Sequence, residues 1–588
     1  MSVAMPRGGR RVRSLDRPGQ VALGLGVLGV AYRLVLILLT VPGSNSDEAT
    51  FGLAAMHIAA GREFPIFLYG QHYMGTVESY LAAPLFALFT PSWPLLRLPL
   101  LALHAVFVYL SYRLTRRLYS PWLATATVGL LALGSERVVR DQITTVGGRP
   151  EIKPAVLGLL LIALALGQHS TRHRWWGFAL FGLLAGLCVW DDWLVLPYLI
   201  AAVGLLLAGT WRDLLGRAGP LVVGGFLVGV TPLIVDNLTA PAGQDSVSVL
   251  RQVSDGAAVV TTATDRLYGA VLVGIPLATG LCPPDGCAPE QMWWGGLYPA
   301  LVLAAVALAV RGMLRPDPTA AGSPSRTPEA TRPRGATGTP EATRPPTAAP
   351  VRPDGDAAVG EARDGPAVSR AAARLRYVGQ LALLVGGVLA LAAYARSALA
   401  ATAPLASARY LSILQISLPA VLWPLWLVAR WTGRAAARTA ARLGGLLAVA
   451  VLALLVALML AATGQLIGQI GTIRTEERQA RELADALRRA GLTRVYGEYW
   501  TCNRLVFNAR ERVVCAVLDD RLRPGQDRYR PYARQIREAG HPAFVLAAGG
   551  PAEASLQRLL RDRKVAATVT EIATFRIYRP EVPLHPPG

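Results

Sequence analysis

Polar residues that could do chemistry gather in a few short stretches, and the first begins with two adjacent carboxylates, Asp47 and Glu48. A carboxylate can take a proton from a hydroxyl group as a general base, or hold that hydroxyl in place. A polar run over residues 69–75 and the carboxylate of Glu78 follow in the same loop. The alternative is structural, because Asp is also favoured at helix starts and Asp47 could cap a helix that begins near Ala49.

The second stretch is basic, and it predicts contacts with a phosphate group. Guanidinium groups form paired hydrogen bonds with phosphate oxygens, and an ammonium group adds a point charge. This function is favoured for Arg149, which follows two glycines, whereas a loop that meets phospholipid headgroups is favoured for Arg137 and Arg140. Arg409, beside Tyr410 at the outer start of a late span, is either a phosphate contact or an anchor at the membrane interface. The charged members of the stretch are Arg137, Arg140, Asp141, Arg149, Glu151 and Lys153.

The third stretch, Asp191 and Asp192, lies between two tryptophans. Paired carboxylates can bind a divalent cation through their oxygens, but no third carboxylate is close in the sequence. A polar turn flanked by tryptophans at a membrane interface is the favoured interpretation. The histidine and cysteine spacings do not predict a metal site. We therefore expect no cofactor and no metal ligands, with a divalent cation as the open alternative.

The elements that must position these residues are membrane helices. Of the 588 residues, 53% are hydrophobic and 16% are charged, and the mean hydropathy is +0.38. Soluble domains carry about a quarter charged residues, and apolar blocks of about 17–25 residues, long enough to cross a bilayer, recur along this chain. The net charge of +21 does not indicate a nucleic-acid partner, because the arginines collect in short runs between apolar blocks, as in cytoplasmic loops.

This charge pattern predicts a mainly α, polytopic membrane protein with about eleven transmembrane helices. A basic cytoplasmic tail over residues 1–20 precedes an N-terminal transmembrane region over 21–314, whose first outer loop, 42–94, holds Asp47. The apolar run 76–89 in that loop is short for a span and predicts an interfacial helix. The predicted spans are 21–41, 95–112, 121–133, 154–166, 176–190, 193–208, 221–235, 293–310, 378–399, 410–428 and 443–467.

Three further regions follow the N-terminal transmembrane region. Residues 315–375 are rich in Pro, Ala, Thr and Arg, cannot bury enough apolar surface to fold, and predict a disordered cytoplasmic linker. C-terminal transmembrane helices occupy 376–467, and residues 468–588 predict a small extracytoplasmic α/β domain with an accessory or acceptor-recognition role. Because disulfides form outside the cytosol, we expect Cys282 to pair with Cys287 and Cys502 with Cys515.

Several short motifs follow one another in a characteristic order. They are residues 47–49 after the first span, 97–99 and 112–117 at the ends of the second, 147–151, and Arg409-Tyr410 at a late span. In this order they resemble the GT-C glycosyltransferases, and most of all the group of protein O-mannosyltransferases and lipid A aminoarabinose transferases. The stretch 147–151 is similar to a Gly-Gly-Tyr-Pro-Glu stretch of bacterial relatives, with Arg149 in place of the tyrosine. The resemblance covers roughly residues 20–470.

The resemblance implies a GT-C-like fold and an inverting glycosyltransferase of the bacterial inner membrane. Such an enzyme moves a hexosyl or pentosyl group from a polyprenyl phosphate-linked donor to an extracytoplasmic glycan, lipid or protein. Asp47 is then the catalytic base, with Glu48 beside it, and Arg149, Lys153 and Arg409 contact the donor phosphate. The remaining predicted substrate-binding residues are Gln71, His72, Tyr73, Glu151, Asp191 and Asp192.

A transporter or flippase of a lipid-linked or polar substrate is the alternative function. Such proteins place polar groups near the bilayer midplane and often contain repeated halves. The sequence contains no such repeat, and Arg33 is the one charge clearly in the middle of a predicted span. The transferase is therefore the favoured prediction.

Overall fold

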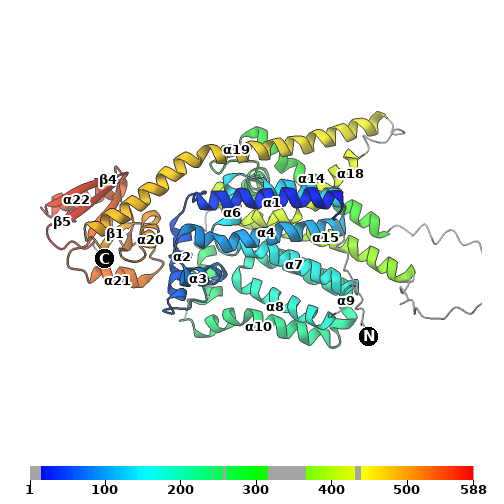
Figure 1. Ribbon diagram of the computed structural model, residues 1–588, viewed down its shortest axis with the longest axis horizontal. Helices are drawn as coiled ribbons and strands as arrows, with labels where there is room; N and C mark the ends of the chain where they lie inside the picture. Colours follow the sequence, from blue (N-terminus) through cyan, green and yellow to red (C-terminus); the bar gives the residue numbers. More distant parts are fainter. Residues whose placement is uncertain are drawn as a thin grey trace, which may run out of the picture.

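The computed structural model describes residues 15–171, 173–241, 243–255, 260–314, 366–430 and 439–586. The predicted basic tail, 1–20, and the predicted linker, 315–375, lie mostly outside the described residues. The described chain is a bundle of long helices with a small α/β domain at one end (Figure 1).

Within the described residues, nine helices are long and apolar enough to cross a membrane. Two further predicted spans are the 12-residue helix α5 (Pro121–Ala132) and α8 (Arg174–Asp191). The chain is thus a mainly α, multi-pass membrane protein, as its composition predicts. The nine helices are α1 (Arg17–Leu38), α4 (Trp93–Leu118), α7 (Arg149–Gly167), η1 with α9 (Trp193–Val195, Leu196–Leu214), α10 (Ala218–Thr239), α14 (Pro289–Leu314), α15 (Pro366–Arg396), α17 with η4 and α18 (Pro404–Ser407, Ala408–Ser417, Leu418–Ala429) and α19 (Thr439–Arg489).

Small residues let two neighbouring helices approach closely. A Cβ atom added at Gly182 of α8 would lie 2.0 Å from the carbonyl oxygen of Val222 in α10, and one at Gly229 of α10 would lie 2.4 Å from the carbonyl oxygen of Leu183. Membrane helices pack through such small residues, because lipid provides no hydrophobic drive for their association.

Short helices cover the end of the bundle that carries the C-terminal domain (Figure 1). They are α2 (Ser46–Ala59), α3 (Val77–Leu88) and α6 (Glu136–Ile143). The predicted interfacial run 76–89 thus forms a 12-residue helix. Asn45, and not Asp47, caps α2, because its side chain accepts a hydrogen bond of 2.9 Å from the backbone N–H of Glu48. Asp47 therefore lies in the first turn with its side chain free for other contacts.

The C-terminal domain is a five-stranded mixed sheet with three helices. Its strand order is β2-β1-β3-β5-β4, with β1 parallel to β2 and β3, and β5 antiparallel to β3 and β4. The domain is thus of the α/β kind that the sequence predicts. The elements are β1 (Arg494–Glu498), α20 (Tyr499–Asn508), β2 (Val514–Leu518), α21 (Arg530–Arg537), β3 (Ala543–Ala547), α22 (Pro551–Asp562), β4 (Ala567–Ile572) and β5 (Phe575–Pro580).

One continuous helix, α19, joins the bundle to this domain. The sequence predicts that the last span ends at 467 and the C-terminal domain begins at 468, but α19 runs unbroken across this boundary for 51 residues (Figure 1). The glycines at 464, 468 and 471 lie inside this helix and do not end it. A glycine inside a helix costs only about 1 kcal/mol relative to alanine.

The C-terminal domain packs directly on the short helices of the bundle. Phe507 of α20 lies against Gly52 of α2, where an added Cβ atom would come within 2.5 Å of the ring. The ring of Trp93, at the start of α4, lies 4.4 Å from that of Phe507 in a tilted arrangement, and its indole N–H donates a hydrogen bond of 2.9 Å to Asn508. Arg504 pairs with Glu477 of α19 at 2.8 Å. The domain and the end of the bundle thus share one hydrophobic core.

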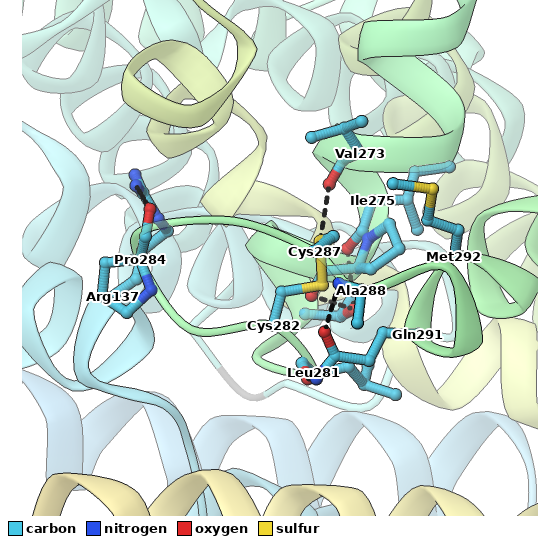
Figure 2. The surroundings of a disulfide bond; sticks show 12 residues. Arg137, Val273, Ile275, Leu281, Cys282, Pro284, Cys287, Ala288, Gln291 and Met292 are labelled. Atoms are coloured by element: carbon cyan, nitrogen blue, oxygen red, sulfur yellow. Dashed lines mark hydrogen bonds between the residues drawn. A yellow bond between two sulfur atoms is a disulfide. The ribbon is translucent and has the colours of Figure 1, made fainter.

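Both predicted disulfides are present, which confirms the expected cysteine pairs. The bond between Cys282 and Cys287 closes a short loop (Figure 2), and the bond between Cys502 and Cys515 joins α20 to β2.

Candidate active site

A polar cavity of about 440 Å³ lies between the short helices and the C-terminal domain. We call it the Asp47 pocket. Its wall comes from segments far apart in the sequence, including the start of α2, α6, the turn before α7, the disulfide loop and the segment before α21. Its charged lining residues are Asp47, Glu136, Arg137, Arg140, Asp141, Arg149, Asp192, Arg409 and Arg528.

Asp47 is held by one of its two carboxylate oxygens. Its Oδ1 accepts hydrogen bonds from the hydroxyl of Tyr499 and, at 3.3 Å, from Nη2 of Arg528. Burial and the nearby Asp47 charge raise the pKa of Tyr499 to about 12, so its hydroxyl remains a donor at neutral pH. Among the described residues, none donates to Oδ2 of Asp47, and the side chain is 34% exposed. This oxygen can therefore accept a proton from a bound hydroxyl.

Three of the five pocket arginines have carboxylate partners. Arg149 pairs with Asp141 at 2.8 Å, and both side chains are buried. Arg140 pairs with Glu136 on the same helix, and Arg528 pairs with Asp47. Their charges are neutralised within the pocket wall.

The other two arginines, Arg137 and Arg409, have no carboxylate partner among the residues that the structure describes. Arg137 donates to the carbonyl oxygen of Pro284 in the disulfide loop at 3.4 Å (Figure 2), and its buried Nε has no acceptor. Arg409 lies 5.3 Å from the ring centre of Tyr410. These two guanidinium groups can bind an anion such as phosphate through paired hydrogen bonds.

A turn of two glycines brings Arg149 to the pocket. Gly147 and Gly148 have φ values of +76° and +70°, a conformation that other residues rarely adopt. The carboxylate of Glu78 accepts from the backbone N–H groups of Val146 and Gly147, at 3.3 Å each. A Cβ atom at position 148 would lie 2.3 Å from Cβ of Asp192. The paired glycines are thus a steric requirement of this site.

We expect Gly148→Ala to lower the thermal unfolding midpoint and to reduce turnover about 100-fold, because small displacements of site residues cost that much. The control is Gly61→Ala, which carries the same backbone strain at a φ of +65° with no atom within 4 Å of its Cβ position. The thermal unfolding midpoint and the turnover number are measured for both variants. If both variants lose stability and turnover to the same extent, backbone strain alone accounts for the loss. The close approach of Gly148 to Asp192 would then have no role in the site.

Five of the predicted site residues line the pocket and six do not. Those that line it are Asp47, Gln71, Arg149, Asp192 and Arg409. Those outside its lining are Glu48, His72, Tyr73, Glu151, Lys153 and Asp191.

Glu48 points away from the pocket, although it is adjacent to Asp47. Its two carboxylate oxygens accept from Nε and Nη2 of Arg97, each at 2.7 Å, and both side chains are fully buried. The pair joins α2 to α4. Glu48 therefore has a structural role in this ion pair. Its buried side chain does not reach a substrate in the Asp47 pocket.

The other residues outside the lining also have different surroundings. Lys153 is buried and contacts the carbonyl oxygen of Asp141 at 3.4 Å. His72 lies 3.4 Å from Asp236 of α10. Glu151 and Asp191 line a separate, largely apolar cavity of about 770 Å³, and no donor reaches either carboxylate oxygen of Glu151 within the described residues.

Asp192 lies in the turn between α8 and η1 and caps the start of η1. It accepts from the backbone N–H of Leu194 at 2.8 Å, and burial raises its pKa to about 6. Over the described ranges, no group of three or more His, Cys, Asp or Glu side chains is placed to hold a metal ion.

Sequence reasoning missed the C-terminal contribution to the site. Arg528 lines the pocket, and Tyr499 hydrogen-bonds Asp47 from a position 452 residues away. The surrounding sequence contains no motif that links either residue to the first loop. Only the docking of the domain brings them together.

Comparison with known proteins gives the fold. No protein-family model and no curated protein sequence matches the chain. ArnT from Cupriavidus metallidurans bound to undecaprenyl phosphate is similar in structure, with a TM-score of 0.55 and 14% identity over 96% of this chain and 99% of that one. Its apo state gives a TM-score of 0.51 at 14% identity, over 97% and 100% of the two chains.

The chain has a GT-C-like fold. The likeness to ArnT spans nearly the whole of both chains, so it includes the C-terminal domain as well as the bundle. It confirms the fold that the order of short motifs predicts. An archaeal oligosaccharyltransferase, AglB from Archaeoglobus fulgidus, gives a TM-score of 0.42 at 12% identity over 90% of this chain and 69% of that one.

Proposed function

We propose that this protein is a glycosyltransferase that moves a sugar from a polyprenyl phosphate-linked donor to an extracytoplasmic acceptor. The observation that carries the proposal is the composition of the Asp47 pocket. A carboxylate with one open oxygen shares this cavity with two arginines, Arg137 and Arg409, that have no carboxylate partner among the described residues. Base and anion-binding groups are the two requirements for displacing a phosphate from a sugar carbon.

The reaction is a single displacement at the anomeric carbon. Oδ2 of Asp47 takes the proton of an acceptor hydroxyl as its oxygen forms the new bond to that carbon. The bond between the carbon and the phosphate oxygen breaks, and the electron pair leaves with the lipid phosphate. Arg137 and Arg409 stabilise the negative charge that develops there. Attack opposite the leaving group inverts the anomeric centre.

The fold supports a lipid phosphate as the leaving group. ArnT, which shares the fold, has been crystallised bound to undecaprenyl phosphate. At 14% identity this likeness does not carry over a sugar or an acceptor, so the hexosyl or pentosyl group and the glycan, lipid or protein acceptor stay open. In this proposal Arg137, and not Arg149 or Lys153, contacts the donor phosphate together with Arg409. The charge of Arg149 is neutralised by Asp141, and Lys153 lies outside the pocket lining.

Charge and disulfides support an orientation with the pocket on the outer face of a bacterial inner membrane. Helix α4 begins at Trp93, which contacts the C-terminal domain, and ends in the basic pair Arg116 and Arg117. Basic segments favour the cytoplasmic side, which leaves the pocket and the domain outside. Both disulfides, one beside the pocket and one in the domain, form in oxidising compartments.

Arg33, the charge that the transporter alternative relies on, has a structural role. It donates to the amide oxygen of Gln142 at 2.8 Å and to the carbonyl oxygens of Leu131 and Ala132 at 2.9 Å each. Its donors join α1 to the end of α5 and to α6. No observation at this residue favours a transport path.

Arg137→Ala and Arg409→Ala test the proposal through donor binding. Each is expected to weaken binding of undecaprenyl phosphate about 10–100-fold, the value of one charge-assisted contact. Native mass spectrometry of the purified protein, titrated with undecaprenyl phosphate, measures the bound fraction. Arg113→Ala, at the basic end of α4, is the control. A co-purifying sugar-bearing lipid in the wild type would identify the donor, whereas binding unchanged in both pocket variants would refute the assignment.

A further inference from the structure

We propose that the C-terminal domain takes part in sugar transfer, with Arg528 and Tyr499 as positioning residues that hold Asp47 by Oδ1 and present Oδ2 to the acceptor. This inference rests on the proposed function and deepens it. It changes the role of the domain from an accessory module to one wall of the active site.

The guanidinium group of Arg528 connects three side chains at the mouth of the Asp47 pocket. Its Nη2 lies 3.3 Å from Oδ1 of Asp47, and its Nε donates to the hydroxyl of Tyr499 at 3.0 Å. With the amide of Gln71 oriented to satisfy its neighbours, the oxygen of Gln71 accepts from both Nη atoms, at 2.8 and 3.2 Å. The Arg528 side chain is 8% exposed, so these contacts are shielded from bulk water.

Tyr499 provides the second donor to the Asp47 carboxylate. We call the pair of donors, Arg528 and Tyr499, the clamp. The ring of Tyr499 lies under the Arg528 guanidinium, 5.7 Å from ring centre to Cζ, and its hydroxyl donates to the same Oδ1 of Asp47. Two donors on one oxygen fix the rotation of the carboxylate. Because both donors come from the C-terminal domain, undocking this domain would release Asp47.

A second network anchors the segment that carries Arg528. His57 of α2 is bonded on one ring nitrogen to Tyr69, at 2.6 Å, and on the other to Glu511 of the domain, at 2.8 Å. Tyr532, four residues after Arg528, donates to the same Glu511 oxygen at 2.8 Å. Burial would raise the pKa of Glu511, but the hydrogen bonds from His57, Arg62 and Tyr532 outweigh it and lower the pKa to about 2. Arg528 is therefore held on the bundle by a network outside the pocket.

Arg528 and Tyr499 would make the same contacts with Asp47 if they only docked the C-terminal domain onto the bundle. Docking of the domain and positioning of Asp47 differ in the quantities that they change. A site that holds its reacting group in one orientation gains rate from that orientation. Loss of the clamp should then lower the turnover number and leave donor binding intact. A docking contact should lower stability and leave the turnover of folded protein intact.

The experiment compares Arg528→Gln, Arg528→Lys and Tyr499→Phe in the full-length protein. The control is Arg523→Ala, an exposed arginine that pairs with Asp519 and does not line the pocket. The donors are radiolabelled undecaprenyl phosphate-linked sugars, and solubilised cell envelope supplies acceptors. We expect Arg528→Gln and Tyr499→Phe to lower kcat about 10–100-fold, with donor KM and undecaprenyl phosphate binding unchanged. Arg528→Lys should recover part of the rate.

A double-mutant cycle with Asp47→Asn decides whether Arg528 acts through Asp47. In the Asp47→Asn background, Arg528→Gln should cause no further loss, because coupled residues are non-additive. Full additivity, or an unchanged kcat in both Arg528 variants, would overturn the inference and leave the proposed function standing. Wild-type protein that binds undecaprenyl phosphate but transfers no sugar from any donor would overturn both.

Discussion

Asp47→Asn is expected to lower the rate of sugar transfer about 100- to 10,000-fold, the usual contribution of a general base. Asn keeps the shape of the side chain and an oxygen that can accept from Tyr499 and Arg528. Its amide nitrogen replaces Oδ2 and cannot take a proton from the acceptor. The variant should therefore fold and bind the lipid phosphate while turnover fails.

Three measurements on purified protein check this result. They are the transfer rate, the bound fraction of undecaprenyl phosphate by native mass spectrometry, and the thermal unfolding midpoint. Asp285→Asn is the matched control, since Asp285 is exposed in the disulfide loop beside the pocket and does not line it. An Asp47→Asn variant that keeps more than about a tenth of the rate would exclude Asp47 as the general base. It would favour a binding role for this carboxylate.

The sequence predicts the fold class and the first pocket residue because both depend on local signals. Apolar blocks and arginine runs are continuous in the chain, so the helices of the bundle can be predicted without tertiary contacts. Asp47 belongs to a short motif that follows the first span. The same local reasoning could not choose between Asp47 as a helix cap and as a site residue, because Asn45 competes for the cap, and only the backbone geometry shows which of the two takes it.

Adjacent side chains in a helix point in different directions. Two adjacent carboxylates such as Asp47 and Glu48 therefore need not lie in the same site. Neighbouring side chains in an α-helix are turned by about 100° from each other, so one carboxylate faces the pocket and the other faces α4. The partner of Glu48 is Arg97, 49 residues away. Arg528 is 481 residues from Asp47. Such pairs form only when the helices pack and the domain docks, and no local pattern in a single sequence predicts them.

The buried pair of Glu48 and Arg97 leads to the largest expected effect on stability. Both side chains are fully buried and joined by two hydrogen bonds of 2.7 Å. Removing one partner leaves an uncompensated charge in the interior, which costs about 3–5 kcal/mol. We therefore expect Glu48→Leu and Arg97→Met each to lower the free energy of unfolding by about that amount.

The double variant, Glu48→Leu with Arg97→Met, separates a structural pair from a catalytic carboxylate. An apolar pair of similar volume avoids the desolvation cost of both charges, so the double variant should recover most of the stability that either single variant loses. Chemical unfolding in detergent measures the free energies, and the transfer rate per folded molecule is compared with that of Asp47→Asn. If the pair is structural, the double variant transfers sugar at a rate near that of the wild type. A stable double variant with the transfer defect of Asp47→Asn would instead assign chemistry to Glu48, and both adjacent carboxylates would then belong to the site.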